Sequence, residues 1–241
     1  MAGIGWIFGY MIDATQAEYV RVPFAENSAY KVPEGTTDQE GILLSDILPT
    51  GFEIGVQYGQ VSPSDVVGVI GSGPVGLSSV VTSRLCGPSK VIAIDLDGAR
   101  LKGASEFGAT NVVNSGDQDW KEQVMALTDG LRVDVAIAAV GLPDTFTMAT
   151  QIVCHGGHVA NVGVHGKPVE LALNELWISN VNISMGLVNT NTLGMLLKLV
   201  AEHKLPAEEF VTHEFAFDQV LEAYDVFGNA GEYDTLKVLI H

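Results

Sequence analysis

The 241 residues carry 12 lysines and arginines against 29 aspartates and glutamates, a net charge of −17. That charge argues against nucleic acids or anionic membranes as partners, and two cysteines are too few for a disulfide framework or a four-thiolate zinc site. Because no apolar run approaches the roughly 18 residues of a membrane span and residues 1–13 lack a signal-peptide pattern, we expect a reduced, cytoplasmic protein.

Strand and helix patterns alternate through the middle of the chain, whose 47% hydrophobic content suits a parallel sheet buried on both faces. Residues 1–45 read as short strands and turns, with one strand over 16–22. The predicted strands that follow are 66–70, 91–94, 111–113, 133–138, 158–162 and 181–187. The first helix between them ends at about residue 86, and the next three span 98–107, 121–127 and 144–153. Residues 190–241 read as helix, strand, helix and strand, the last over 236–240.

Six alternating strands predict an α/β fold with a complete doubly wound parallel sheet, the Rossmann architecture. We divide the chain into a nucleotide-binding domain over 50–188 and two flanking segments, 1–49 and 189–241. The flanking segments do not fit the alternation. They are therefore expected to pack on the outside of the sheet or on each other.

The most informative stretch is a strand–turn–helix–strand unit over 65–95 with the turn Gly-Ser-Gly-Pro-Val-Gly at 71–76. In such a unit Gly71 permits the tight turn, Gly73 lets a pyrophosphate approach the backbone, and Gly76 lets the helix pack against the strand. The helix N-terminus offers free N–H groups to the phosphates. Asp95 follows about 20 residues later, where a carboxylate accepts ribose hydroxyls and repels the extra phosphate of NADP. The pattern predicts NAD binding.

S-adenosylmethionine is the nearest rival ligand, because it also binds after the first strand of a similar fold. That ligand favours an acidic residue at the end of the first strand and looser glycine spacing. Here the strand over 66–70 runs directly into Gly71. NAD is therefore preferred.

With these motifs in view, the chain resembles the medium-chain, zinc-type alcohol dehydrogenases. The resemblance rests on TQAEYVRVP, LLSDILPTGFE, VIGSGPVGL, AIDLD, FGATNVVNS, ANVGVHGKPVEL and LKVLI. It implies that the two chain ends form a remnant of a GroES-like β domain beside the Rossmann domain. It also implies hydride transfer between a primary or secondary alcohol, or the matching ketone, and NAD.

The resemblance assigns roles to residues at matching positions. It places Asp46 as a catalytic zinc ligand and Thr50 beside the nicotinamide, with Arg100 flanking the adenine and Lys237 reaching the pyrophosphate. The other implied cofactor-binding residues are Gly71, Ser72, Gly73, Pro74, Val75, Gly76, Asp95, Leu96, Val140, Gly141, Val162, Gly163 and Val164.

The same resemblance makes zinc doubtful in this chain. Members of the family normally begin with a segment that holds a cysteine ligand and a Gly-His-Glu ligand motif, and neither is found here, so that of the three zinc ligands only Asp46 is present. A zinc site needs three protein ligands and an open position. We expect an N-terminally shortened form that binds NAD and has weak or absent alcohol dehydrogenase activity. A zinc-independent reductase of the same superfamily and a non-catalytic NAD-binding or interaction module are the alternatives.

Three polar motifs can each be interpreted as a metal site or as an ordinary structural feature. Cys154, His155 and His158, with His165 nearby, suggest a metal cluster, but a strand over 158–162 would hold His155 and His165 at opposite ends. The pair at 213–214, His-Glu, lies in a strand of the return segment and is expected to be structural. Asp46 could instead cap a helix that begins near Pro49.

The strand over 181–187 is expected to be the last in the sheet, so its outer edge would be unpaired. In the family this strand pairs with its two-fold mate. We therefore expect a homodimer or tetramer assembled through residues 181–188, with a monomer as the alternative.

Overall fold

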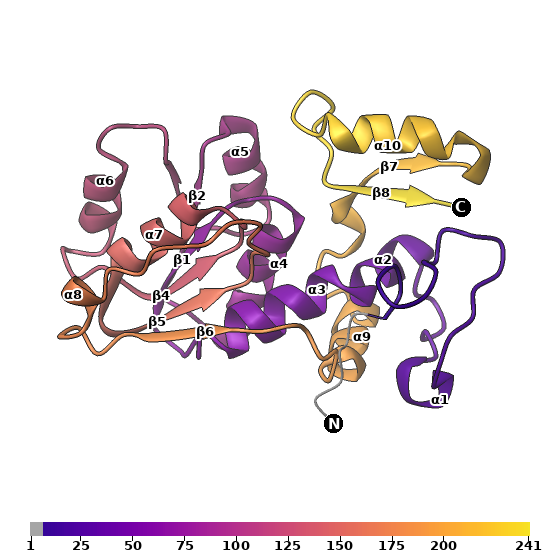
Figure 1. Ribbon diagram of the computed structural model, residues 1–241, viewed down its shortest axis with the longest axis horizontal. Helices are drawn as coiled ribbons and strands as arrows, with labels where there is room; N and C mark the ends of the chain where they lie inside the picture. Colours follow the sequence, from indigo (N-terminus) through magenta and orange to yellow (C-terminus); the bar gives the residue numbers. More distant parts are fainter. Residues whose placement is uncertain (1–6) are drawn as a thin grey trace.

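The computed structural model describes residues 7–241. Its centre is a six-stranded sheet with the order β3-β2-β1-β4-β5-β6 (Figure 1). The strands are β1 (Val66–Ile70), β2 (Lys90–Asp95), β3 (Asn111–Asn114), β4 (Val133–Ala138), β5 (Val153–Asn161) and β6 (Asn182–Met185). Every neighbouring pair is parallel. This is the doubly wound Rossmann sheet that the sequence predicts.

Helices cover both faces of the sheet, and the apolar core divides accordingly into two clusters. Val67 and Val69 belong to the cluster that holds Leu77, whereas Ile70 belongs to the cluster that holds Phe146. This alternation is the two-residue period of a strand buried on both sides. The helices are α4 (Pro74–Ser83), α5 (Gly98–Glu106), α6 (Trp120–Leu127), α7 (Pro143–Ile152) and α8 (Leu173–Leu176).

The remaining elements come from the two ends of the chain. Before the sheet lie α1 (Ala25–Ser28), α2 (Asp38–Ile42) and α3 (Ile47–Thr50), and α3 continues as the π-helical segment Gly51–Gln57. After it come α9 (Leu193–Ala201), β7 (Val211–Phe215), α10 (Val220–Gly228) and β8 (Lys237–Ile240). The predicted order of helix, strand, helix and strand is confirmed, and β7 and β8 form a separate two-stranded parallel sheet. Within residues 7–241, no helix is long and apolar enough to cross a membrane.

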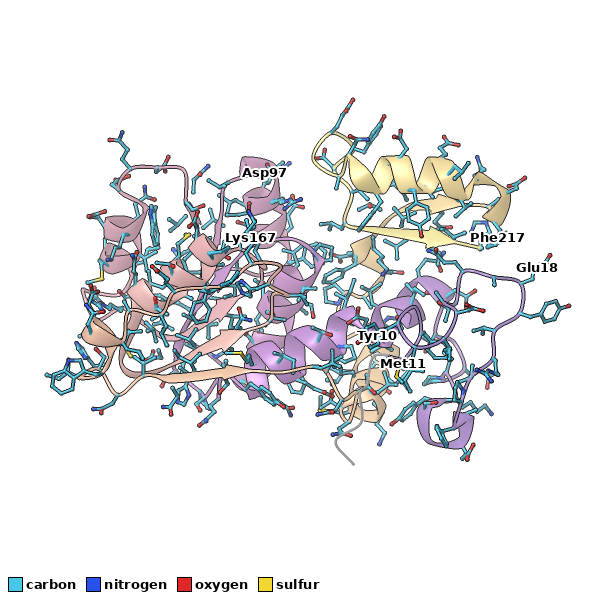
Figure 2. All side chains as sticks on the ribbon, in the orientation of Figure 1. Tyr10, Met11, Glu18, Asp97, Lys167 and Phe217 are labelled. Atoms are coloured by element: carbon cyan, nitrogen blue, oxygen red, sulfur yellow. The ribbon has the colours of Figure 1, made fainter. Side chains whose placement is uncertain are left out.

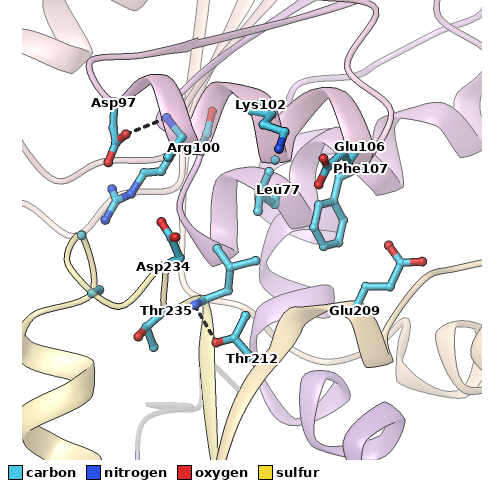
Figure 3. Close-up of a pocket in the computed structure, with 16 residues that line it drawn as sticks. Leu77, Asp97, Arg100, Lys102, Glu106, Phe107, Glu209, Thr212, Asp234 and Thr235 are labelled. Carbon is cyan, nitrogen blue, oxygen red and sulfur yellow. Dashed lines mark hydrogen bonds between the residues drawn. The ribbon is translucent and has the colours of Figure 1, made fainter.

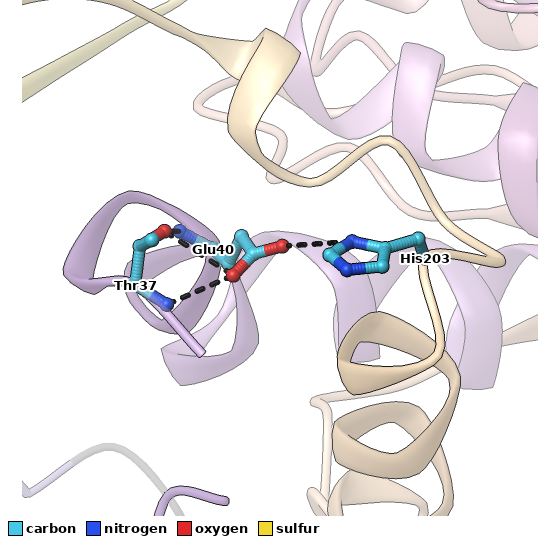
Figure 4. Close-up of polar contacts among 3 residues, drawn as sticks. All are labelled: Thr37, Glu40 and His203. Carbon is cyan, nitrogen blue, oxygen red and sulfur yellow. Dashed lines mark hydrogen bonds and ion pairs between the residues drawn. The ribbon is translucent and has the colours of Figure 1, made fainter. Parts of the chain in front are cut away.

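The two ends contact each other, which is one of the two predicted arrangements. Gln39 Nε2 donates to Glu214 Oε1 at 3.0 Å. Glu40 is buried, caps α2 together with Thr37, and places Oε1 3.5 Å from Nδ1 of His203 (Figure 4). The domain limits at residues 49/50 and 188/189, and the assignment of the ends to a GroES-like domain, stay predictions.

The predicted strand over 16–22 is wrong, and so are the other short strands expected between residues 7 and 45, where the structure has only one isolated bridge, between Phe8 and Ile12. Residues 1–6 lie outside the described residues. The structure places residues 16–22 in an irregular outer segment, in which Tyr19 is 90% exposed and Glu18 projects outward (Figure 2). A strand needs a neighbouring backbone to pair with. In the part of the chain that the structure describes, residues 16–22 pair with no strand of either sheet.

The fifth strand is longer than the sequence suggests. It begins at Val153 rather than at residue 158, directly after α7. Its pairing with β4 shifts register between Val133 and Val135, and Gly156 has a φ of +80°. Between these two pairs β4 advances by two residues and β5 by five, so β5 bulges there, and Gly156 and Gly157, which the sequence places before the strand, are part of it.

A buried carboxylate links the N-terminal helix to the segment that follows β6. Glu53, in the π-helical segment, is 4% exposed. Its Oε2 accepts hydrogen bonds from the backbone N–H groups of Asn189 and Thr190 at 2.9 and 3.1 Å. Its Oε1 accepts from the backbone N–H and the hydroxyl of Thr192 at 2.9 and 2.8 Å. Four donors thus satisfy the buried charge and fix the turn that leads into α9.

Replacing Glu53 by alanine should therefore destabilise the fold. Three backbone N–H groups would lose their acceptor, so we expect a loss of roughly 2–4 kcal/mol in the free energy of unfolding, measured by urea denaturation. Glu122, an exposed residue of α6, provides the control, and Glu122→Ala should change stability by less than about 0.5 kcal/mol. Equal effects of the two substitutions would contradict this role of Glu53.

Candidate nucleotide-binding site

The turn over residues 71–76, which we call the glycine elbow, joins β1 to α4 and admits no side chain at two of its positions. Gly71 has a φ of +98°, and a Cβ atom there would lie 2.3 Å from Cγ2 of Val140. A Cβ atom on Gly76 would lie 1.8 Å from the carbonyl oxygen of Gly71. Gly73 differs, because a Cβ atom there would have no neighbour within 4 Å. The elbow is thus closed on its inner side and open at Gly73.

The open side coincides with the start of α4. Pro74 occupies the first turn of the helix, and no side chain caps its N-terminus. The first N–H groups of a helix have no partner within it, and they carry the positive end of its dipole. Gly73 and this helix end therefore fit the pyrophosphate of a dinucleotide.

Asp95 lies beside the elbow, at the end of β2. Its Oδ2 accepts a hydrogen bond from the backbone N–H of Ser72 at 2.6 Å, and its Oδ1 accepts one from that of Asp97 at 3.0 Å. These bonds orient the carboxylate and leave it further lone pairs. Asp97 in turn caps α5 by accepting from the Ala99 N–H at 2.8 Å. The structure therefore brings the predicted ribose-binding carboxylate to the predicted phosphate-binding turn.

The turns after β4 and β5 meet at the same edge of the sheet. The N–H groups of Val162 and Gly163 donate to the carbonyl of Ala138 at 2.9 and 3.0 Å. A Cβ atom on Gly163 would lie 2.4 Å from the carbonyl carbon of Val140, and one on Gly141 would lie 1.9 Å from the oxygen of Val164. Because Val140 also touches the elbow at Gly71, all these predicted residues form one region.

Asp46 and Thr50 lie on the helix that packs against α4, where the Ser78 hydroxyl donates to the Ile47 carbonyl at 2.9 Å. Helix α3 begins at Ile47, so the predicted start near Pro49 is corrected by two residues. Asp46 occupies the N-cap position, yet its side chain makes no capping bond with the backbone. Its Oδ1 accepts instead from the Thr50 hydroxyl at 2.7 Å.

A catalytic zinc ion does not fit the residues that the structure describes. Over residues 7–241, no group of three or more histidine, cysteine, aspartate or glutamate side chains lies close enough to hold a metal ion. Asp46 alone provides a carboxylate at its position, whereas zinc takes three protein ligands.

The histidine and cysteine motif of β5 is likewise not gathered into a cluster. Cys154 Sγ lies 3.8 Å from Oδ1 of Asp134. Burial, with the charge of Asp134 as a second cause, raises the pKa of the Cys154 thiol and so disfavours the thiolate that a metal needs. His165 lies beyond the end of β5, where its Nε2 is 2.9 Å from Oδ1 of Asn161.

Three further predicted cofactor residues lie outside the turns described above. Leu96 is 72% exposed, and Arg100 is an exposed residue of α5. Lys237 lies on β8, where it lines a small hollow of about 180 Å³ with Gln16 and Tyr224. Its assignment to the pyrophosphate stays a prediction.

A larger cavity of about 420 Å³ lies between α5, the start of α4 and the turn over residues 230–236 (Figure 3). Ser72 and Arg100 are the two predicted cofactor residues in its lining. The other polar lining residues were missed by sequence reasoning. They are Asp97, Lys102, Glu106, Glu209, Thr212, Asp234 and Thr235. No local pattern marks them, because the chain segments that form the cavity lie far apart in the sequence.

The parallel sheet, the glycine elbow and the adjoining carboxylate together define a dinucleotide-binding α/β domain. The sequence profile of the zinc-binding dehydrogenase family matches residues 74–202, which is more than half of the chain. The chain therefore belongs to the zinc-binding dehydrogenase family.

Individual relatives agree with this assignment. An alcohol dehydrogenase from Cupriavidus necator is 34% identical over 99% of this chain and 66% of its own length. An NADP-dependent isopropanol dehydrogenase from Thermoanaerobacter brockii is 32% identical over 91% of this chain and 64% of its own length. The apo structure of zinc-dependent alcohol dehydrogenase 2 from Streptococcus pneumonia has a TM-score of 0.93 and 48% identity over 96% of this chain and 66% of that one. The chain thus spans just under two thirds of the length of these relatives.

The elbow geometry predicts that one alanine substitution lowers the stability of the fold strongly and that another hardly changes it. Gly76→Ala forces a methyl group against the Gly71 carbonyl, so we expect a loss of roughly 1–3 kcal/mol in unfolding free energy. Gly73→Ala places its methyl group in open space at a φ of −74° and should cost less than about 0.5 kcal/mol. Urea denaturation measures both. Comparable losses would show that the elbow is not closed as described.

Proposed function

We propose that this chain binds NAD at the glycine elbow and serves hydride transfer between a small alcohol or ketone and the cofactor. The observation that carries the proposal is the open face of Gly73, flanked by the uncapped start of α4 and by the oriented carboxylate of Asp95. These groups match the pyrophosphate and the ribose of a dinucleotide. Membership of the zinc-binding dehydrogenase family supports the same reaction class.

In this proposal the chain's own residues bind and orient the cofactor. The elbow and the start of α4 hold the pyrophosphate, and Asp95 accepts the ribose hydroxyls. The packed turns at 140–141 and 162–164 form the surface against which the nicotinamide is placed. The bound dinucleotide supplies a ring that accepts or donates hydride. We assign Thr50, whose hydroxyl donates to Asp46, to the nicotinamide end of the site.

The number of possible zinc ligands affects the rate at which this chain could oxidise alcohols. Metal-assisted alcohol oxidation needs a cation to stabilise the developing alkoxide, and residues 7–241 do not offer a three-ligand site for one. We therefore propose that this 241-residue polypeptide by itself binds NAD and oxidises alcohols slowly or not at all. A metal-independent reductase is the second candidate, because a conjugated or hydrogen-bonded carbonyl can accept hydride without a cation. Reduction of quinones or enones with NADH would identify it.

The charge of Asp95 predicts selectivity for NAD over NADP. Calorimetric titration should show tighter binding of NAD, because the 2′-phosphate of NADP would meet the carboxylate. Asp95→Ser should weaken NAD by roughly 10- to 100-fold, since it removes hydrogen bonds to a charged group. Asp218→Ser, at an exposed position before α10, should leave affinity unchanged. If the wild-type chain bound neither dinucleotide, the proposed function would be wrong.

We also propose that the chain assembles as a homodimer, or as a tetramer built from such dimers, through β6. This strand is at the end of the sheet, and its last residue, Met185, and Leu187, which follows it, are 60% and 50% exposed. An unpaired strand with apolar side chains can continue the sheet into a second copy. The free thiols of Cys86 and Cys154 suit a reducing compartment, and we propose a cytoplasmic location.

Light scattering should therefore give at least twice the chain mass of 25.6 kDa at micromolar concentration. Met185→Asp, which puts a charge on β6, should reduce the mass to that of one chain. Leu221→Asp introduces the same charge on the exposed face of α10, where Leu221 is 83% exposed, and should not change the mass. A single-chain mass for the unmodified protein would exclude assembly through β6.

A further inference from the structure

Strand β5 ends in a polar pair that the nucleotide site described above does not use. Asn161, the last residue of the strand, is 8% exposed, and its Oδ1 lies 2.9 Å from Nε2 of His165. The Asn161 side-chain amide also donates from Nδ2 to the carbonyl of Gly163 at 3.0 Å. One buried side chain therefore holds both the middle and the far end of the turn over residues 162–165.

These bonds determine which nitrogen of His165 carries a hydrogen. Because Nδ2 of Asn161 donates to Gly163, the atom that faces the imidazole is Oδ1, which can only accept. Nε2 of His165 must therefore be the donor. The other ring nitrogen, Nδ1, is buried and has no hydrogen-bond partner among the described residues. The bond to Asn161 is thus the polar contact by which this ring is held.

Packing against α7 also fixes the ring. Phe146, which is 7% exposed, meets the imidazole edge to face, with 6.2 Å between the ring centroids and 89° between the ring planes. Aromatic pairs of this geometry are favourable beyond their buried area. His165 is thus held by α7 through its ring and by β5 through Nε2. Support by both packing and hydrogen bonding is what keeps a binding surface rigid.

The turn that His165 holds has no room to adjust. A Cβ atom on Gly163 would lie 2.4 Å from the carbonyl carbon of Val140, and one on Gly141 would lie 1.9 Å from the carbonyl oxygen of Val164. The side chain of Val164, between Gly163 and His165, is 82% exposed. A shift of the turn would therefore move the surface that the proposed function assigns to the nicotinamide.

We propose that His165 and Asn161 are positioning residues that fix the turn over 162–164 for the nicotinamide half of the dinucleotide. The inference rests on the proposed function and deepens it. Neither side chain needs to touch the cofactor, because each acts through the backbone of the turn. The effect is confined to one half of the ligand, since the glycine elbow and Asp95 hold the other half from the ends of β1 and β2.

The test uses two ligands that differ in the nicotinamide. ADP-ribose has the pyrophosphate and both riboses of NAD but lacks the nicotinamide ring. His165→Phe keeps a ring beside Phe146 and removes the donor to Asn161. Calorimetric titration of this variant should show the Kd for NAD raised roughly three- to tenfold, the value of one neutral hydrogen bond, and the Kd for ADP-ribose unchanged within about twofold.

A conservative variant should restore the wild-type behaviour. His165→Gln offers a side-chain N–H that can donate to Oδ1 of Asn161, so its Kd for NAD should return to that of the unmodified chain. The fluorescence of bound NADH reports the surroundings of the nicotinamide directly. It should be alike for the unmodified chain and His165→Gln, and different for His165→Phe. His165→Leu serves for the same comparisons if the larger ring of phenylalanine prevents folding.

His158 provides a matched control in the same strand. Its Nδ1 is also buried without a partner in the described part of the chain, but it lies within β5, paired with Val135 and Asn182. His158→Phe should leave the ratio of the Kd values for NAD and ADP-ribose unchanged. The melting temperatures of the free variants show whether each of them is folded.

The remaining outcomes overturn the positioning role or the proposed function separately. If His165→Phe bound NAD as tightly as the unmodified chain, or weakened both ligands by the same factor, the positioning role would be wrong, while NAD binding by the unmodified chain would still support the proposed function. The role would also be wrong if His165→Gln were as weak as His165→Phe, or if His158→Phe changed the ratio equally. If the unmodified chain bound neither ligand, the proposed function would fail, and this inference with it.

Discussion

The nucleotide site depends on a contact between two stretches of backbone at the elbow. A Cβ atom on Gly76 would overlap the carbonyl oxygen of Gly71, and one on Gly71 would overlap Val140. The absence of both lets the first turn of α4 lie directly against the ends of β1 and β4. Helix α4 is held equally closely from its other side, since a Cβ atom on Gly51 would lie 2.3 Å from Ser78 Oγ. The sheet, α4 and the helix carrying Thr50 therefore behave as one packed unit.

Much of this unit could be predicted from the sequence, because the signals that specify it are local. Strands β1, β2 and β4 are short, largely apolar runs that are mostly buried, and β3 is an edge strand with Val113 buried and Val112 exposed. The limits of all four differ from the prediction by at most one residue. The elbow and Asp95 have a local signal too, because the glycine spacing and the acidic residue at the end of the second strand form one strand–turn–helix–strand pattern. The structure brings Gly71, Asp95, Val140 and Val162 to one edge of the sheet, as parallel strands require.

What could not be predicted depends on partners distant in the sequence. Strand patterns before residue 45 indicated β structure, but a strand forms only where another backbone is available to pair with it. The burial of Glu53 against Asn189 and Thr192 has no local signal either, because these residues lie more than 130 positions away. The cavity lined by Thr235 has no sequence signal, because it exists only where the return segment folds back over α5.

The carboxylate of Glu53 has a consequence for how the molecule moves. It connects residues 136 to 139 positions apart in the sequence. If either segment moved away, the carboxylate or the backbone N–H groups bound to it would be buried without a hydrogen-bond partner. The helix over 47–57 and the turn over 189–192 should consequently open together, as one cooperative unit, on the timescale of amide hydrogen exchange. A surface turn would then exchange its protons as slowly as the helix to which it is bound.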